Sequence, residues 1–548
     1  MRPLRRAGLA AAAVLTAAAA VLASPAGQQP AQAAVSARNL PADGKILSIM
    51  GQDSDTLAAY KADVLDKPAL NAPRPGGVTL YTNLVLGGSP EPLAGIVGPA
   101  DWGAGKVDFN ATLAQYPGSA LAVGLYLSDA TSGCNNQPLR AVIGRGDSDV
   151  TAGSPSLISQ YRAKVDQMVT SLKGYDRPVY LRIGYEFDGP WNCYSADYYK
   201  QAFAYIKGRI DALGANNVAT VWQSAAWPLN ANPDHPEWNY VVTDPAHYDT
   251  WYPGDQYVDW VALSSFYNSG SLATQWGCSH YDTAPVALQN RVLDFARTHG
   301  KPVMVAESAP QGYQTGAHTQ SCIFQKNQTA ATGQGIWNQW YAPYFAWINQ
   351  NRDVIRAAAY INTNWDSQTL WQCADGAQAG GPGCGNGYWG DSRVQADPTV
   401  LADFLAQLRG GQWVNGTGTT PPPATGSPSP SSSPSASSSP SNSPAPSNSP
   451  TASPSPGDSQ APYTQGLATG TAPKLWFKPN GFTATFVTVH YTVNGGAQAN
   501  YFLTWNAGAG RWEQPLTVKS GDRVTYWFDY QRSDQTFQVS TPTWTVTA

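Results

Sequence analysis

The stretch Val179-Tyr-Leu-Arg-Ile-Gly-Tyr-Glu-Phe-Asp-Gly-Pro-Trp-Asn192 is the most informative part of this chain for its fold and its candidate site. Its first half is a short apolar run rich in β-branched and aromatic residues, closed by Asp-Gly-Pro, which predicts a buried strand and a turn. Side chains alternate along a strand, so Arg182, Gly184 and Glu186 are expected on one face, with Glu186 at the carboxyl end. A carboxylate, a guanidinium and a tryptophan at one strand end suggest sugar chemistry. The alternative is a glutamate that only caps a strand, and a partner carboxylate would decide between the two.

Strands and helices are predicted to alternate on both sides of this stretch. Apolar runs predict eight strands, at residues 45–52, 76–87, 120–127, 179–186, 218–224, 257–264, 302–307 and 355–362. Apolar residues at helical spacing predict helices at 157–172, 196–213, 287–298, 334–349 and 397–408. Eight such units predict an α/β fold, a (β/α)₈ TIM barrel over residues 40–412. No Gly-x-Gly-x-x-Gly follows the first strand, which argues against a dinucleotide-binding sheet.

The carboxyl ends of the predicted strands supply a second carboxylate. Glu186 ends the fourth strand and Glu307 ends the seventh, so they should face each other across the barrel mouth. Two such carboxylates suit glycoside hydrolysis, at a separation of about 5–5.5 Å when the anomeric configuration is retained. Tyr267 could donate to Glu307, Trp365 could form the floor under a sugar, and Arg182 should lie deeper, supporting the barrel or pairing with a carboxylate. The other mouth candidates are Tyr185, Trp191 and Trp227.

Composition limits the partners of the chain. The net charge of its 548 residues is −4 and only 13% are charged, so no nucleic-acid or anionic-membrane partner is implied. The 20 tryptophans and 28 tyrosines suit the faces of sugar rings. Residues 1–34 predict a removed signal peptide, because three arginines precede an apolar run and Ala31-Gln-Ala33 offers a cleavage site. We therefore expect a secreted, monomeric protein that binds a polysaccharide and needs no metal or organic cofactor.

Six cysteines fit a secreted protein. They allow 15 disulfide connectivities, among which the sequence alone does not choose. Cys373 with Cys384 is the simplest pair to predict because the two enclose a Gly-rich loop. The pairs Cys278 with Cys322 and Cys134 with Cys193 would complete the set. A zinc site is the alternative, but no Cys-x-x-Cys or paired-His spacing supports it.

The carboxyl-terminal part differs from the barrel. Residues 417–459 are Pro-, Ser-, Thr- and Gly-rich without apolar periodicity, which predicts an extended linker. Residues 463–548 alternate as short strands separated by turns such as Asn494-Gly-Gly, which predicts a small all-β sandwich domain. A linker of this kind would hold the barrel near a polymer bound by the sandwich.

Several segments of the barrel resemble glycoside hydrolase family 26. They are Lys-Ile-Leu-Ser-Ile-Met-Gly-Gln (45–52), Leu-Arg-Ile-Gly-Tyr-Glu-Phe-Asp-Gly-Pro-Trp (181–191), the 17-residue run at 251–267 and Lys-Pro-Val-Met-Val-Ala-Glu (301–307). The resemblance implies retaining hydrolysis, mostly of β-1,4-mannan and in some members of β-glucan or β-1,3-xylan. It implies Glu186 as acid/base, Glu307 as nucleophile, and Tyr267 and Trp365 as supporting residues. Members typically carry His before the acid/base, and Tyr185 stands there in this chain.

The sandwich resembles carbohydrate-binding module family 56, which binds β-1,3-glucan. The resemblance rests on Leu-Trp-Phe-Lys-Pro (475–479), Val-His-Tyr-Thr-Val-Asn-Gly-Gly (489–496), Gly-Arg-Trp-Glu-Gln-Pro (510–515) and Val-Thr-Tyr-Trp-Phe-Asp-Tyr (524–530). Candidate rings for stacking on sugar are Trp476, Trp505, Trp512 and Trp527. Together with Tyr185, the module favours β-1,3-glucan or a mixed-linkage β-glucan as substrate. The alternatives are an endo-β-1,4-mannanase and a catalytically silent polysaccharide-binding protein.

Overall fold

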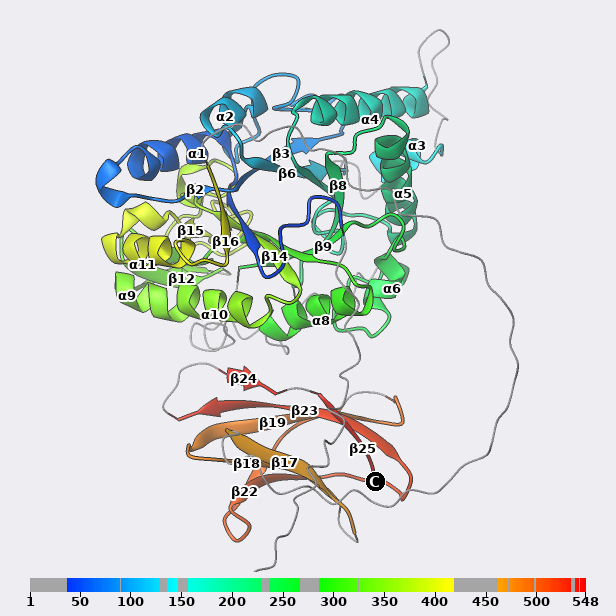
Figure 1. The fold of residues 1–548 in the computed structure, drawn as a ribbon, viewed down its shortest axis with the longest axis vertical. Coiled ribbons are helices and arrows are strands. Elements are labelled where there is room, and N and C mark those ends of the chain that lie inside the picture. The colour runs from blue at the N-terminus through cyan, green and yellow to red at the C-terminus, as the bar shows by residue number, and fades with distance from the viewer. Residues whose placement is uncertain are drawn as a thin grey trace, which may run out of the picture.

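The computed structural model describes two folded parts of the chain (Figure 1). The described residues are 37–88, 90–128, 136–145, 156–227, 236–266, 285–323, 325–417, 462–470, 473–496, 499–533, 538–541 and 543–548. Within these ranges no helix combines the length and the apolar character that crossing a membrane would require.

Eight parallel strands close into a barrel, which confirms the predicted fold. They are β1 (Ile46–Gly51), β3 (Gly77–Asn83), β6 (Ala120–Tyr126), β7 (Val179–Ile183), β8 (Val218–Ser224), β9 (Trp260–Ser265), β10 (Val303–Ser308) and β14 (Ile355–Ile361). Each strand pairs with the next in this order, and β14 pairs with β1 to close the ring. Figure 1 shows the helices as an outer layer around this ring.

The helices follow the predicted positions closely. The five predicted ones appear as α4 (Leu157–Gly174), α5 (Ala196–Ala212), α8 (Pro285–Thr298), the α9–α10 segment (Gly333–Ile336 and Ala342–Gln350, joined by the π-helical turn Trp337–Tyr341) and α11 (Pro398–Leu408). The sequence did not predict the shorter helices α1 (Ser54–Tyr60), α2 (Phe109–Gln115), α3 (Gln137–Val142) and α6 (His247–Trp251). Asp397 caps α11 by accepting a hydrogen bond from the Val400 amide, as its position after a turn suggests.

Several short strands lie outside the eight-stranded ring. The strands β11 (Tyr313–Gln314), β12 (Thr319–Cys322), β13 (Gln325–Ala330) and β15 (Gly390–Asp391) form a separate four-stranded sheet after β10. We call β11–β13, β15 and the loop that contains Cys373 and Cys384 the insert. Strand β16 (Trp413–Gly416) pairs with β1 and with β2 (Arg74–Pro75), and β4 (Ala100–Asp101) pairs with β5 (Lys106–Val107).

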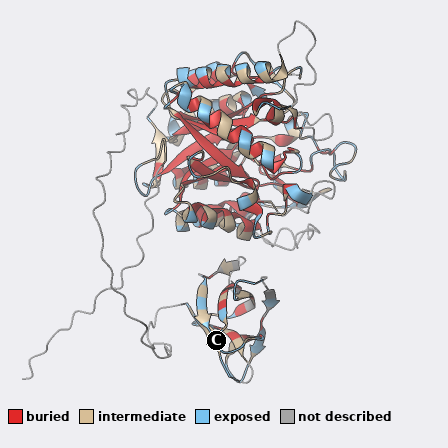
Figure 2. Cartoon of the chain, turned by 90° about the vertical axis from the view of Figure 1, so that its right-hand side faces the viewer, coloured by how far each residue is buried: buried red, intermediate tan, exposed pale blue. Residues whose placement is uncertain are grey.

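Two apolar cores hold the barrel, one inside the ring and one outside it. Figure 2 shows the strands as the most buried layer and the outer faces of the helices as exposed. The interior core is built largely of alanine, with Tyr180 and Trp260 in edge-to-face contact at 5.2 Å between ring centroids. The larger core lies between the strands and the helices.

Gly124 on β6 leaves room for a large cation inside the barrel. A Cβ atom at this position would lie 2.5 Å from Cδ1 of Tyr81 and 2.8 Å from NH2 of Arg182. Both neighbours belong to fully packed strands, so neither can move away cheaply. Glycine is therefore required here by close approach of its neighbours.

The sandwich domain is also confirmed. One sheet has the order β17 (Tyr463–Ala468), β18 (Lys474–Pro479), β22 (Arg511–Pro515) and β21 (Thr504–Asn506). The other contains β20 (Ala499–Phe502), β19 (Ala484–Val493), β23 (Arg523–Arg532), β24 (Gln538–Ser540) and β25 (Trp544–Thr547). The apolar run at 501–505 predicts one continuous strand, which is wrong, because the strand pairing breaks at Leu503 and the segment contributes one strand to each sheet.

The disulfide Cys373–Cys384 is present as predicted. Cys193 is also disulfide-bonded. Its predicted partner Cys134 lies outside the described residues, as does Cys278, so the two remaining predicted pairs stay predictions.

We expect Gly124→Ala to destabilise the barrel by about 1–3 kcal/mol, the usual cost of overpacking a full core. The matched control is Gly208→Ala in α5, where nothing lies within 4 Å of the new Cβ. That change should stabilise the protein by about 0.5–1 kcal/mol, because alanine is the better helix former. Thermal unfolding of the two full-length variants measures both effects, and an equal response would contradict the close-approach argument.

Candidate active site

Glu307 lies at the end of β10, almost completely buried. The register between β9 and β10 shifts between Val305 and Glu307, which brings Glu307 level with Ser264. Such irregularities re-aim side chains near functional sites. Its Oε1 atom accepts hydrogen bonds from NH1 of Arg182 at 2.6 Å and from Nε2 of Gln223 at 3.2 Å. Glu307 is therefore held by one cation and one amide.

Arg182 is a fully buried cation inside the barrel. Besides Glu307, its NH1 donates to Oε1 of Gln223 and its NH2 donates to Oγ1 of Thr79. The guanidinium also lies over the ring of Tyr81 at 4.7 Å and over that of Tyr185 at 5.5 Å. The expectation that Arg182 pairs with a carboxylate rather than reaching substrate agrees with these contacts.

Glu186 does not lie on the strand, which corrects the sequence interpretation. Strand β7 ends at Ile183, and both Gly184 (φ +54°) and Glu186 (φ +50°) take the left-handed conformation. The strict alternation that would place Arg182, Gly184 and Glu186 on one face therefore stops at Gly184. The turn instead carries the Glu186 carboxylate to Ser264 on β9, two strands away around the ring.

Neighbouring residues hold this strained turn in place. Phe187 stacks on Trp222 at 4.4 Å, and its amide donates to the carbonyl of Gln223. Asp188 is fully buried and accepts from the Ala225 amide at 2.7 Å and from the Ser224 hydroxyl. A left-handed non-glycine residue persists only where surrounding contacts impose it.

A buried histidine completes the support of the turn. Nε2 of His247 lies 2.9 Å from Oδ2 of Asp188, and its Nδ1 lies 2.8 Å from the carbonyl oxygen of Asn239. A carbonyl only accepts, so Nδ1 carries a proton and donates it. One further proton then lies between the imidazole and the Asp188 carboxylate, and it ties α6 to the turn that bears Glu186.

Among the residues that the structure describes, the Glu186 carboxylate accepts hydrogen bonds from neutral donors only. Ser264 donates to Oε1 at 2.6 Å and the indole of Trp191 donates to Oε2 at 3.0 Å. Burial, followed by the negative charge of Glu307, raises the pKa of Glu186 to about 8, although the bonds from Ser264 and Trp191 lower it. At neutral pH Glu186 is therefore mostly protonated and can donate a proton.

Gln223 and Ser264 connect the two carboxylates. The Gln223 side-chain nitrogen donates to Glu307 and also to the Ser264 hydroxyl at 3.1 Å, and that hydroxyl donates to Glu186. The arrangement contains a charged pair, Arg182 with Glu307, and a neutral acid, Glu186. It can supply both a nucleophilic carboxylate and a proton donor at one barrel mouth.

The other predicted mouth residues have diverse surroundings. Trp191 is 46% exposed and reaches Glu186. Tyr185 contacts Tyr81 edge-on at 5.2 Å, and burial raises its pKa well above the usual value. Trp365 is buried in a cluster with Phe266 and Ala309, and Trp227 packs against this cluster. Tyr267 lies outside the described residues, so its predicted bond to Glu307 stays a prediction.

Sequence reasoning missed part of the network. No role for Tyr81, Gln223 or Ser264 was predicted from the sequence. The available signal was a polar side chain at the end of an otherwise apolar strand, which in a barrel points to the mouth. The described residues contain no group of three His, Cys, Asp or Glu side chains placed to hold a metal ion.

The predicted module tryptophans are divided between two sheets. Trp505 contacts Trp512 at 5.7 Å, and the Arg511 guanidinium covers Trp476, all on the β18–β22–β21 sheet. Trp527 lies on the outer face of the other sheet, stacked on His490 at 4.9 Å. Beside it, Oδ2 of Asp529 lies within hydrogen-bond distance, 2.9 Å, of Nε2 of His490. The other carboxylate oxygen of Asp529, Oδ1, is buried and has no partner among the described residues. A sugar hydroxyl could satisfy that oxygen.

Both folded parts of the chain are similar to known proteins. The family model of carbohydrate binding module family 56 matches residues 465–541. The β-1,3-xylanase TXYA of a Vibrio species is 34% identical over 378 residues, which cover 68% of this chain and 67% of that protein. A β-1,3-xylanase of an Alcaligenes species is 33% identical over 385 residues, covering 70% and 67%. A solved family 56 β-1,3-glucan binding domain is 36% identical and covers 16% of this chain and 99% of that one, with a TM-score of 0.14.

We expect kcat/KM for polysaccharide hydrolysis to fall above a pKa of about 8, because only protonated Glu186 can act as the acid. Ser264→Ala removes a hydrogen bond that favours the charged carboxylate, so the pKa of Glu186 should rise and the alkaline limb should move to higher pH. Trp191→Phe should move the limb in the same direction by less. A limb that moves to lower pH in Ser264→Ala would contradict the assignment.

We expect Trp527→Ala to weaken binding of the full chain to insoluble β-1,3-glucan by about tenfold, or roughly 1.4 kcal/mol. The comparison variant is Trp505→Ala, on the other sheet. This variant should lose less affinity for the glucan, because among the described residues no unpartnered buried acceptor lies beside Trp505. Depletion isotherms measure both. A larger loss in Trp505→Ala would place the binding face on the β18–β22–β21 sheet instead.

Proposed function

The chain belongs to the family of the Vibrio and Alcaligenes β-1,3-xylanases, and from this premise we propose that it hydrolyses β-1,3-xylan. It is a glycoside hydrolase that carries a carbohydrate-binding module. The observation that carries the substrate proposal is the identity to both xylanases across the barrel, together with the two carboxylates at its mouth. The motifs at 181–191 and 301–307 support placing it in glycoside hydrolase family 26.

We propose double displacement with retention of configuration. Both hydrogen bonds that Glu307 accepts from the described residues end on Oε1, so we assign Oε2 as the attacking oxygen. It forms a bond to the anomeric carbon while the glycosidic oxygen leaves with the proton of Glu186. The products of this step are the released chain end and a glycosyl ester on Glu307.

The second step uses the same two residues in exchanged roles. Once Glu307 is an ester, it has lost the negative charge that helped raise the pKa of Glu186. Glu186, now ionised, has a lower pKa and takes a proton from water as that water attacks the anomeric carbon. Hydrolysis of the ester restores the Glu307 carboxylate and its pairing with Arg182.

A second candidate substrate is β-1,3-glucan, favoured by the match of residues 465–541 to the module family. The two candidates share the β-1,3 linkage that the sequence favoured over β-1,4-mannan. They differ in the hydroxymethyl group at C5, which xylose lacks. A barrel that cuts xylan would then be joined to a module whose family binds β-1,3-glucan.

We further propose that the protein is secreted and monomeric. The amino-terminal leader and the disulfides support export to an oxidising compartment. The Pro- and Ser-rich composition at 417–459 supports a linker between catalytic and binding domains.

We expect Glu307→Ala to lower turnover of β-1,3-xylan by at least about 10⁴-fold, the scale seen when a catalytic nucleophile is removed. Binding to β-1,3-glucan through the module should stay unchanged, which is the internal control for folding and export. Surviving turnover would mean that the nucleophile is misassigned. Wild-type protein that releases reducing ends only from laminarin, or only from mannan, would overturn the xylan proposal, and product sizing would distinguish endo from exo action.

A further inference from the structure

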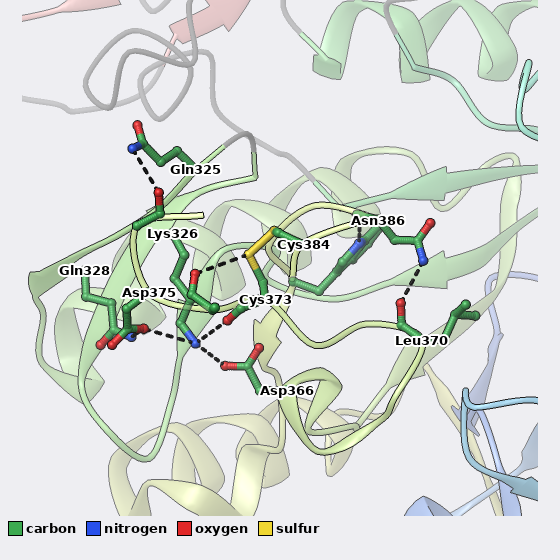
Figure 3. Close-up of a disulfide and its surroundings, with 12 residues drawn as sticks. Gln325, Lys326, Gln328, Asp366, Leu370, Cys373, Asp375, Cys384 and Asn386 are labelled. Atoms are coloured by element: carbon green, nitrogen blue, oxygen red, sulfur yellow. Dashed lines mark hydrogen bonds and ion pairs between the residues drawn. A yellow bond between two sulfur atoms is a disulfide. The ribbon is translucent and has the colours of Figure 1, made fainter. Parts of the chain in front are cut away.

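A cavity of about 620 Å³ lies beside the Cys373–Cys384 disulfide, away from the carboxylate pair. Figure 3 shows its surroundings, with Lys326 from β13 reaching under the disulfide loop toward Asp366. Its lining includes Lys326, Asp366, Thr369, Leu370, Gln372 and Ala374. The mechanism above uses none of these residues. The volume is within the range of small-molecule sites.

The walls of this cavity are fixed before any ligand arrives. The disulfide closes the loop, and the amide of Ala374 donates across it to the carbonyl of Gly383 at 2.8 Å. Leu370, on the opposite wall, accepts from the side chain of Asn386 and donates its amide to Gly103. A preformed site loses less entropy when it binds a ligand.

The charges in the cavity disfavour an anion. Nζ of Lys326 donates to Oδ2 of Asp366 and to the carbonyl of Cys373, each at 2.9 Å, and forms an ion pair with Asp375 at 3.4 Å (Figure 3). The three N–H donors of the ammonium are therefore occupied by two carboxylates and a carbonyl. A phosphate or carboxylate ligand would find no free cation among these described groups.

One buried acceptor in the lining of the cavity lacks a hydrogen-bond donor among the described residues. Oδ1 of Asp366 is buried and has no hydrogen-bond partner among the described residues. An unsatisfied buried acceptor costs free energy, which a ligand O–H can recover. Exposed polar side chains of Thr369 and Gln372 lie on the same lining. A neutral, hydroxyl-rich ligand fits this combination.

Packed tryptophans lie between the lining of the cavity and the catalytic mouth. Asp366 directly follows Trp365, whose cluster contains Ala309, two residues after Glu307. The ring of Trp371, next to the lining residues Leu370 and Gln372, lies 5.4 Å from that of Trp365. Trp365 is itself buried, so a polysaccharide chain that leaves the carboxylate pair would pass the partly exposed Trp371 on its way to the cavity.

We propose that this cavity is a distal subsite for a neutral sugar residue of the polysaccharide that Glu186 and Glu307 cleave. The inference rests on the proposed function. In this subsite the Asp366 carboxylate accepts a sugar hydroxyl, and the disulfide loop sets the shape of the wall. The subsite strengthens binding of long chains only, since a short chain at the carboxylate pair does not extend to it.

The test fills the cavity and varies the length of the substrate. Ala374→Trp places a bulky ring in the cavity, and the matched control Gln378→Trp places one on the same loop at an exposed residue outside the lining. Substrates are β-1,3-xylo-oligosaccharides from the trimer upward. We expect Ala374→Trp to lower kcat/KM about tenfold for long oligosaccharides and less than twofold for the trimer, with Gln378→Trp unchanged. Equal effects of Ala374→Trp at every length would overturn the subsite.

A milder variant covers the case in which the tryptophan disturbs folding. Gln372→Ala only removes an exposed polar side chain and should lower kcat/KM about twofold to threefold for long chains alone. No change at any length in Gln372→Ala together with a misfolded Ala374→Trp would also overturn the proposal. If wild type cleaves β-1,3-glucan and not xylan, the proposed function fails, and the same length series with laminari-oligosaccharides still decides the subsite.

Discussion

The barrel is organised around one buried ion pair, Arg182 with Glu307. A charge without a partner in a dry interior is prohibitively unfavourable, so every neighbour of Arg182 must stabilise it. Glu307 supplies the opposite charge at 2.6 Å, Gln223 and Thr79 each accept one further hydrogen bond, and the rings of Tyr81 and Tyr185 lie against the guanidinium. Position 124 must be glycine because a side chain there would collide with the same cation. Below this level the interior is alanine-rich and apolar, so the ion pair also marks where the structural core ends and the mouth begins.

The different roles of the two carboxylates follow from which one meets the cation. Glu307 has Arg182, whereas Glu186 has only the hydroxyl of Ser264 and the indole of Trp191. Burial and the charge on Glu307 then raise the pKa of Glu186. Gln223 contacts both halves of the arrangement, which fixes their geometry relative to each other. The proposed acid and the proposed nucleophile have the same functional group, and they differ because the described residues place a cation beside Glu307 and none beside Glu186.

The sequence predicted the barrel well because strand identity depends on local apolar patterning. Strand β8 and its residues 218–224 were predicted to the residue, and Glu307 was found because strand ends meet at one mouth. The turn at Gly184 and Glu186 was not predictable in this way. Its left-handed backbone depends on contacts that Phe187 and Asp188 make with strand β8 and with His247 of α6, which are distant in the sequence. The insert was missed for a related reason, since strands such as Gln325–Ala330 are polar and carry no periodic apolar signal.

The insert and the barrel contribute differently to the recognition of a polymer. A barrel mouth built on one ion pair tolerates little change, because each residue that touches Arg182 also affects how its guanidinium is positioned against Glu307. The insert has no such constraint, and its small apolar core around Tyr388 is reinforced by a disulfide instead. Chain length and side groups of a substrate can therefore be read by the insert without altering the pKa of Glu186. In this arrangement the chemistry is set inside the ring of strands, and selectivity among β-1,3-linked chains is set by the loops and small sheet around it.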